Sequence, residues 1–266
     1  MKIKKQNNFA LLDKVCIITG GAGLLGSAFA KECLLREARV VLVDIDEERG
    51  RKTVRKIIKS TGRNRIIFEK CDIKIGDEVR SLVSRVHKRY GKIDALVNSA
   101  YPRNKNFGKK FEDVSFEDFC ENVSMHLGGY FLMTKEVARV MKKQHGGVIV
   151  MLGSIYGFSA PKFEIYKGTD MTVSVEYAAL KGGILNLIKY LAAYLGPHGI
   201  RVNALSPGGV FDGQPKSFVD KYSMKVPLSH RMAYPKDISP ALVFLLSDAS
   251  QYITGQNIVV DGGWSI

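Results

Sequence analysis

The stretch Thr19-Gly20-Gly21-Ala22-Gly23-Leu24-Leu25-Gly26 carries glycines at three-residue intervals. An apolar run over 14–18 precedes it and is expected to form a buried strand, and a helix is expected over 24–37. Gly20 permits a tight turn, Gly23 lets the backbone approach a phosphate, and Gly26 lets the helix pack on the strand. Phosphate oxygens would then meet free N–H groups at the positive end of the helix dipole. The stretch therefore predicts a phosphate-binding turn between a strand and a helix.

Short runs of Val, Ile and Leu alternate with helix-like stretches along nearly the whole chain. Further strands are expected at 39–44, 65–68, 93–97, 147–152, 200–204 and 257–260, with a second helix over 47–59. Strands without polar alternation are buried on both faces, as in a parallel sheet covered by helices. Repeated βα units with right-handed crossovers predict an α/β fold, a Rossmann-type doubly wound sheet in three αβα layers.

The 266 residues contain no repeat, low-complexity tract or long linker. A single domain is therefore expected over 13–266, after an N-terminal tail at 1–12. Two stretches, 158–175 and 210–234, interrupt the alternation of strands and helices. Ligands of such sheets bind outside the carboxyl ends of the strands, so both stretches are candidate substrate loops.

Several features indicate the setting in which the protein works. No apolar run is long enough to span a bilayer, and no apolar signal region follows the basic start. The four cysteines are widely spaced, with no CxxC pair or Cys/His cluster, which is typical of reduced thiols. We therefore expect a cytoplasmic protein with no membrane partner and no metal site.

The chain is basic, with 40 Lys and Arg against 26 Asp and Glu and a formal net charge of +14. The basic cluster over 49–65 could be a nucleic-acid surface or a solvated helix face. It contains no aromatic residue that could stack on bases, which favours the solvated face and no nucleic-acid partner. A second cluster, over 103–110, follows a strand end and could face an anionic ligand.

Asp44 ends the second expected strand, 18 residues after Gly26. A carboxylate there accepts hydrogen bonds from ribose hydroxyls and repels a 2′-phosphate, which favours NAD over NADP. Taken alone, Asp44 could equally cap the following helix. Together with the glycine turn, it predicts a dinucleotide site.

From about Lys14 to Trp264 the chain resembles the short-chain dehydrogenase/reductase family. The motifs that carry the resemblance are Cys71-Asp72-Ile73, Asn98-Ser99-Ala100-Tyr101, Gly153-Ser154-Ile155, Tyr177-Ala178-Ala179-Leu180-Lys181, Asn203-Ala204-Leu205-Ser206-Pro207-Gly208 and the ending Tyr252 to Gly263. Their order is that of the compact branch of the family. The resemblance implies that Asp72 contacts adenine and that the turn through Pro207 and Gly208 packs on nicotinamide. It also implies an enzyme that acts on a CH–OH group, as a homotetramer or homodimer.

The cofactor implied is NAD. The residues expected to bind it are Gly20, Gly23, Leu25, Gly26, Asp44, Asp72, Ile73, Asn98, Ala100, Tyr177, Lys181, Pro207, Gly208 and Val210.

Tyr177 and Lys181 are four residues apart and so share one face of a helix. A phenol with a pKa near ~10 is a poor base at neutral pH, but an ammonium and a positive nicotinamide nearby would lower that pKa. Tyr177 would then take the proton of a substrate hydroxyl while Ser154 holds the oxygen. Standing alone, the YxxxK pattern would favour a surface Tyr and Lys on an ordinary helix.

Three features depart from the family pattern. His126 stands where the family has a catalytic Asn; its imidazole could take part in a relay to the lysine, or it could be structural. Ser154 and Tyr177 are 23 residues apart, more than is usual in the compact branch. The extra residues predict a flap beside the active site or an excursion into solvent. With Leu24 inside it, the glycine turn also resembles the extended branch that acts on nucleotide sugars.

The flap, the stretch 98–104 and the stretch 207–212 resemble oxidoreductases of flagellin modification and nonulosonic-sugar biosynthesis. This resemblance implies a sugar or another polar substrate, which could carry a phosphate. The side chains of Arg103, Lys105, Lys109 and Lys110 could bind that phosphate, or they could be solvated charges.

The sequence favours interconversion of a secondary alcohol and a ketone. A nucleotide-sugar epimerase or dehydratase that retains NAD, and a dinucleotide-sensing protein without catalysis, are the alternatives.

Overall fold

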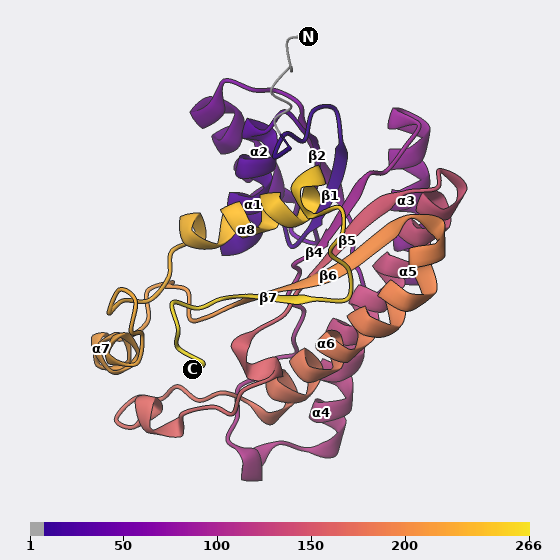
Figure 1. Ribbon diagram of the computed structural model, residues 1–266. Coiled ribbons are helices and arrows are strands. Elements are labelled where there is room, and N and C mark those ends of the chain that lie inside the picture. The colour runs from indigo at the N-terminus through magenta and orange to yellow at the C-terminus, as the bar shows by residue number, and fades with distance from the viewer. Residues whose placement is uncertain (1–7) are drawn as a thin grey trace.

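Seven parallel strands form the central sheet, in the order β3-β2-β1-β4-β5-β6-β7 (Figure 1). The computed structural model describes residues 8–266. The strands are β1 Val15–Thr19, β2 Arg39–Asp44, β3 Ile66–Lys70, β4 Ala95–Asn98, β5 Gly147–Leu152, β6 Ile200–Pro207 and β7 Asn257–Val260. The chain starts at a central strand, moves to one edge, returns and continues to the other edge. This order confirms the predicted doubly wound sheet.

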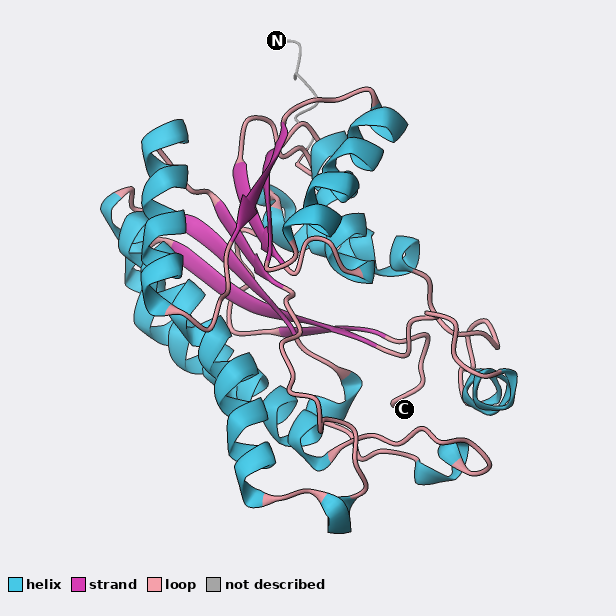
Figure 2. Ribbon diagram, turned by 180° about the vertical axis from the view of Figure 1, so that it is seen from behind, coloured by secondary structure: helices cyan, strands magenta, loops and turns pink. Residues whose placement is uncertain are grey.

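Helices cover both faces of the sheet (Figures 1 and 2). The helices α1, α2 and α8 lie on one face, and α3, α5 and α6 lie on the other, which completes the predicted αβα layers. The helices are α1 Leu24–Leu35, α2 Glu47–Thr61, α3 Gly76–Tyr90, α4 Phe116–Val123, α5 Gly129–Lys143, α6 Val175–Leu195, α7 Lys216–Met224 and α8 Pro235–Leu246. In residues 8–266, no helix has both the length and the apolar character needed to cross a membrane.

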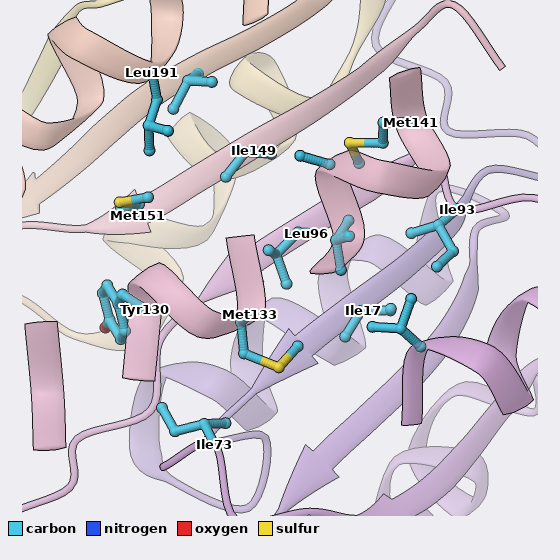
Figure 3. Close-up of a cluster of buried hydrophobic side chains, with 14 of the residues drawn as sticks. Ile17, Ile73, Ile93, Leu96, Tyr130, Met133, Met141, Ile149, Met151 and Leu191 are labelled. Carbon is cyan, nitrogen blue, oxygen red and sulfur yellow. The ribbon is translucent and has the colours of Figure 1, made fainter. Parts of the chain in front are cut away.

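The core has two halves because successive side chains of a buried strand point to opposite faces. Ile17 packs with the α3, α5 and α6 half, whereas Ile18 packs with the α1 and α8 half. Figure 3 shows Met133 and Met141 of α5 near the strand residues of the first half. Both faces of the central strands are therefore buried, as the apolar runs in the sequence predict.

Several element ends differ from the sequence prediction by one to three residues, and two of them have a clear structural cause. The strand expected over 200–204 continues to Pro207, because residues 204–207 of β6 pair with all four residues of β7. The helix expected to reach Glu37 ends at Leu35, and Glu37 adopts a left-handed φ of 70° that no helix continues. The longer β6 extends the sheet beneath the candidate substrate loops.

The predicted N-terminal tail of residues 1–12 packs on the domain over its last residues. Leu11 is fully buried in the α1 and α8 half of the core, and its N–H donates to the carbonyl of Arg36. Asn8 accepts a hydrogen bond from the N–H of Ala249. Residues 1–7 of the predicted tail lie outside the described residues.

The predicted flap over 158–175 folds back onto the protein instead of extending into solvent. A 3₁₀ turn over Phe163–Tyr166 buries Ile165 and places Tyr166 against Phe218 of α7. The amine of Lys162 donates to the carbonyl of Trp264 at 2.9 Å, and Figures 1 and 2 both show the C-terminus between this segment and α7. The segment 158–175, α7 and the C-terminal residues thus form one packed unit beside the sheet.

Candidate active site

Two adjoining cavities lie at the carboxyl ends of the strands. The larger, of about 660 Å³, extends from the glycine turn past Asp44 and Asp72 to Lys181. The smaller, of about 260 Å³, is lined by Ser154, Pro207 and Gly208 and by the 158–175 segment and α7. Leu25, Leu152, Tyr177 and Val210 line both. Tyr177 therefore stands at the boundary between two compartments.

The glycine turn forms one end of the larger cavity. Gly20 has a φ of 63°, and a Cβ there would collide with the backbone of Ala100. A Cβ on Gly26 would collide with the carbonyl of Gly20, so this glycine lets α1 pack on the turn itself and not on the strand as expected. At the start of α1, Gly23 offers no side-chain cap and the first turn has no acidic residue. The N–H groups at this helix end are therefore available to an anion.

Asp44 closes the same end of the cavity. Its Oδ2 accepts from the N–H of Ala22 at 2.9 Å, and its Oδ1 accepts from the N–H of Asp46 at 3.2 Å. The cap of α2 is Asp46, whose side chain accepts from the N–H of Arg49. The alternative role considered for Asp44, capping the following helix, thus belongs to its neighbour, and the Asp44 carboxylate is tied to the glycine turn.

Asp72 and Ile73 follow β3 and line the middle of the larger cavity together with Ala100. The carboxylate of Asp72 accepts from the N–H of Lys74 and pairs with the amine of Lys74 at 3.4 Å. An uncapped helix start, two carboxylates and apolar walls along one cavity form a donor and acceptor set that fits a dinucleotide. The residues present therefore fit the cofactor that the sequence implies.

Asn98 lies behind the cavity instead of lining it. Its Nδ2 donates to Thr134 Oγ1 at 3.0 Å and to the carbonyl of Tyr130, both on α5. These two hydrogen bonds hold α5 against β4. Asn98 supports the wall of the cavity from inside the protein.

Tyr177 and Lys181 lie on the first turns of α6 and both face the larger cavity. Ser154 follows β5, is buried, and forms a hydrogen bond with Tyr177. The amine of Lys181 donates to the carbonyl of Leu152 at the end of β5, at 2.6 Å. Leu152 and Ser154, at the end of β5, thus hold the Lys181 amine and the Tyr177 hydroxyl of α6.

His126 lies against the same lysine. A π-helical turn over Ser124–Gly128, between α4 and α5, buries the imidazole and places its Nε2 at 3.4 Å from Lys181 Nζ. Burial, and then the charge of Lys181, hold the pKa of His126 well below its usual range, so the imidazole is neutral. Its Nδ1 is buried and has no partner among the described residues. The structure thus brings His126 to the predicted catalytic group.

The pKa of Tyr177 is raised by the protein itself, whereas the sequence predicts that Lys181 together with a bound nicotinamide lowers it. Burial raises it above its ordinary value, and the hydrogen bond with Ser154 offsets this only in part. Burial also lowers the pKa of Lys181 to about 7, so this amine is only partly charged at neutral pH. Desolvation therefore outweighs the effect expected of the lysine, and the chain alone does not produce a phenolate.

Tyr101 is the main site residue that the sequence prediction missed. Its ring meets Tyr177 edge-on with centroids 5.7 Å apart and His126 with centroids 5.2 Å apart. The Arg103 guanidinium lies 5.1 Å from the Tyr101 ring centroid. Tyr101 stands where the family motif has glycine. An aromatic side chain shortly after the end of β4 was the signal in the sequence that could have indicated a wall of the site.

A polar network fixes the loop that carries Tyr101. The N–H of Asn104 donates to Asn122 Oδ1 at 2.9 Å, and Asn122 Nδ2 donates to the buried carboxylate of Glu176 at 3.3 Å. Asp118 accepts from the side chains of Asn104 and Asn106 and pairs with Lys109 at 3.4 Å. One of the four predicted phosphate-binding cations, Lys109, is thus used inside the loop.

Comparison with known proteins extends over nearly the whole chain. Residues 21–265 match the protein-family model described as Enoyl-(Acyl carrier protein) reductase. The chain is 37% identical over 257 residues to post-translational flagellin modification protein A of Campylobacter coli, covering 96% of this chain and 100% of that protein. It is 31% identical to the NAD-dependent glycerol dehydrogenase of Listeria innocua, with 98% and 97% covered. A solved short-chain dehydrogenase from Leptospira borgpetersenii with bound NAD⁺ is 34% identical, with a TM-score of 0.83 and 100% and 98% covered.

The buried amine of Lys181 predicts a stability effect. Its pKa is about 7 in the folded protein and 10.5 ordinarily, so between these values only the unfolded chain holds the proton, and stability rises with pH. Replacing Lys181 with Met removes this cost, and we expect the variant to melt roughly 5 °C above the wild type at pH 7. The difference in melting temperature between the variant and the wild type should be smaller at pH 9.5. Thermal melts at both pH values measure it.

The matched control is Lys189→Met, which removes an exposed lysine from the same helix and should show no such gap. A Lys181→Met variant that melts at or below the wild-type temperature at both pH values would contradict the lowered pKa of Lys181.

Proposed function

The chain belongs to the short-chain dehydrogenase/reductase family, and we propose that it interconverts a secondary alcohol and a ketone with NAD(H). The observation that carries the proposal is the position of Tyr177, which lines both the larger cavity, where a dinucleotide fits, and the smaller cavity beside Ser154. A group at this boundary can exchange a proton with a substrate that lies next to the cofactor.

Four side chains of the protein serve this reaction. Ser154 holds the substrate oxygen, and Tyr177 takes its proton in oxidation or returns it in reduction. Lys181 supplies charge near the phenol, and His126 is a neutral relay or positioning group for that lysine. The nicotinamide cofactor, when bound, supplies the hydride acceptor or donor, and its positive oxidised ring favours the phenolate that the chain alone does not stabilise.

NAD is the proposed form of the cofactor. The carboxylate of Asp44, fixed by the N–H groups of Ala22 and Asp46, would accept from ribose hydroxyls and repel a 2′-phosphate. Arg49, close to Asp44 in the sequence, also lines the larger cavity and would favour a 2′-phosphate. Because Asp44 is held by two backbone donors, we give it the greater weight.

A polar, sugar-like alcohol is the proposed substrate class. The similarity to a glycerol dehydrogenase supports it, and so do the hydroxyl groups of Tyr156, Tyr166 and Tyr222 in the smaller cavity. Of the cations considered as phosphate ligands, Arg103 lines the larger cavity and forms no ion pair with residues 8–266. An anionic substituent of the substrate would therefore have to lie on the Arg103 side of Tyr177.

A second copy of this chain is the proposed protein partner. The helices α5 and α6 lie side by side on the outer face of the molecule (Figure 1). They expose Phe131, Tyr190 and Tyr194, and the last two rings stack with their centroids 6.0 Å apart. Exposed aromatic side chains on two adjacent helices are suited to an isologous contact, in agreement with the homodimer or homotetramer that the resemblance implies.

Replacing Tyr177 with Phe tests the catalytic assignment. Loss of a positioned acid–base group should lower kcat by about 10²- to 10⁴-fold, while NADH still binds. Turnover is measured by NADH absorbance over a panel of secondary alcohols, and binding by NADH fluorescence. Tyr252→Phe, at a fully exposed tyrosine, is the control and should retain activity, whereas near wild-type turnover in Tyr177→Phe would refute the assignment.

Cofactor preference tests the role of Asp44. We expect NADP(H) to bind at least tenfold more weakly than NAD(H), and Asp44→Asn to narrow that ratio because the repulsive charge is removed. Both affinities are measured by titration of the same protein preparation. An equal or inverted ratio in the wild type would show that Arg49 outweighs Asp44.

A further inference from the structure

The two cavities that meet at Tyr177 differ in charge. The larger is lined by Asp44, Asp72, Lys74, Arg103 and Lys181, among others. Within residues 8–266, no Asp, Glu, Lys, Arg or His lines the smaller one. A carboxylate or phosphate placed in the smaller cavity would lose its hydration without gaining a countercharge, which is costly.

The polar groups of the smaller cavity are mainly neutral hydroxyls. Tyr156 and Tyr166 share one hydrogen bond between their hydroxyl oxygens, at 3.0 Å. Two hydroxyls have two protons and one bond uses one of them, so the pair keeps one O–H for another acceptor. Burial raises the pKa of both tyrosines, so the pair remains protonated at physiological pH.

The segment 158–175 supplies half of this pair. Tyr166 is held by Phe218 of α7, and Tyr156 lies edge-on to Tyr177 with the ring centroids 6.4 Å apart. Tyr156 also contacts Trp264, with the centroids 5.7 Å apart. The pair is therefore rigid, close to the proposed acid–base group, and present only because the chain between Ser154 and Tyr177 is long enough to fold back.

We propose that the Tyr156–Tyr166 pair binds a second oxygen of the substrate and thereby selects small, uncharged polyols or hydroxyketones. This inference rests on the proposed oxidoreductase function and narrows its substrate class. One oxygen is held by Ser154 and Tyr177, and an adjacent substrate hydroxyl accepts a hydrogen bond from the free O–H of the pair. Anionic substrates are disfavoured because no cation lines this compartment.

Size supports the same class. A volume of about 260 Å³ lies just below the range of roughly 300–1,000 Å³ that ligand pockets usually occupy. A small polyol fits such a space, whereas the nucleotide part of a nucleotide-linked sugar would have to extend out of it. The enclosure by Phe218, Met171 and Met232 suits the carbon face of a small molecule.

Two matched substrate pairs test this proposal in the complete enzyme with NAD⁺. Butane-2,3-diol and butan-2-ol differ by the second hydroxyl, and glycerol and glycerol 3-phosphate differ by the charge. We expect the diol to have the higher kcat/KM of the first pair and glycerol to exceed its phosphate by more than tenfold. The double variant Tyr156→Phe/Tyr166→Phe removes both hydroxyls and should lower the diol-to-monoalcohol ratio about three- to tenfold, the worth of one hydrogen bond.

Tyr252→Phe, at a fully exposed tyrosine, is the control and should leave both ratios unchanged. A kcat/KM on glycerol 3-phosphate that exceeds the kcat/KM on glycerol would overturn the inference while leaving the proposed function intact. So would a diol-to-monoalcohol ratio that the double variant does not change. No turnover of any alcohol by an enzyme that binds NADH would overturn both.

Discussion

Burial of the Lys181 amine constrains the whole candidate site. Its Nζ contacts the carbonyl of Leu152 and the neutral imidazole of His126, and burial alone accounts for its low pKa. The carbonyl belongs to the end of β5, and the imidazole depends on a π-helical turn between α4 and α5. Sheet and helix must both be in place before the lysine has partners, and the lysine in turn fixes the helical face that carries Tyr177.

Charge is divided between the two cavities in a way that suits a two-ligand reaction. Carboxylates, cations and an uncapped helix start line the side where a dinucleotide fits. Neutral hydroxyls and apolar side chains line the side beside Ser154. Tyr177 touches both, so one hydroxyl serves a highly charged ligand on one side and an uncharged one on the other.

Local patterns in the sequence predicted the sheet, the glycine turn and the shared helical face of Tyr177 and Lys181, because each depends on short-range spacing or on strand burial. The role of Ser154 was predicted from the resemblance to the family. The similarity to flagellin-modification proteins was also confirmed. Tyr101 was missed, and the fold of the 158–175 segment was left open, because both depend on contacts between residues far apart in the chain. The rise in the Tyr177 pKa is another such case, since desolvation is a property of the packed structure and not of the YxxxK pattern.

Trp264 links three segments that are distant in the chain. Its ring stacks on Tyr222 of α7 with the centroids 5.6 Å apart, its edge meets Tyr156, and its carbonyl accepts from Lys162. Grafting a single loop from a relative would separate partners that pack as one unit. Exchange of specificity between such enzymes would therefore require a composite transplant of 158–175, 210–234 and the C-terminal residues, and a fusion partner is better attached at the opposite end of the polypeptide.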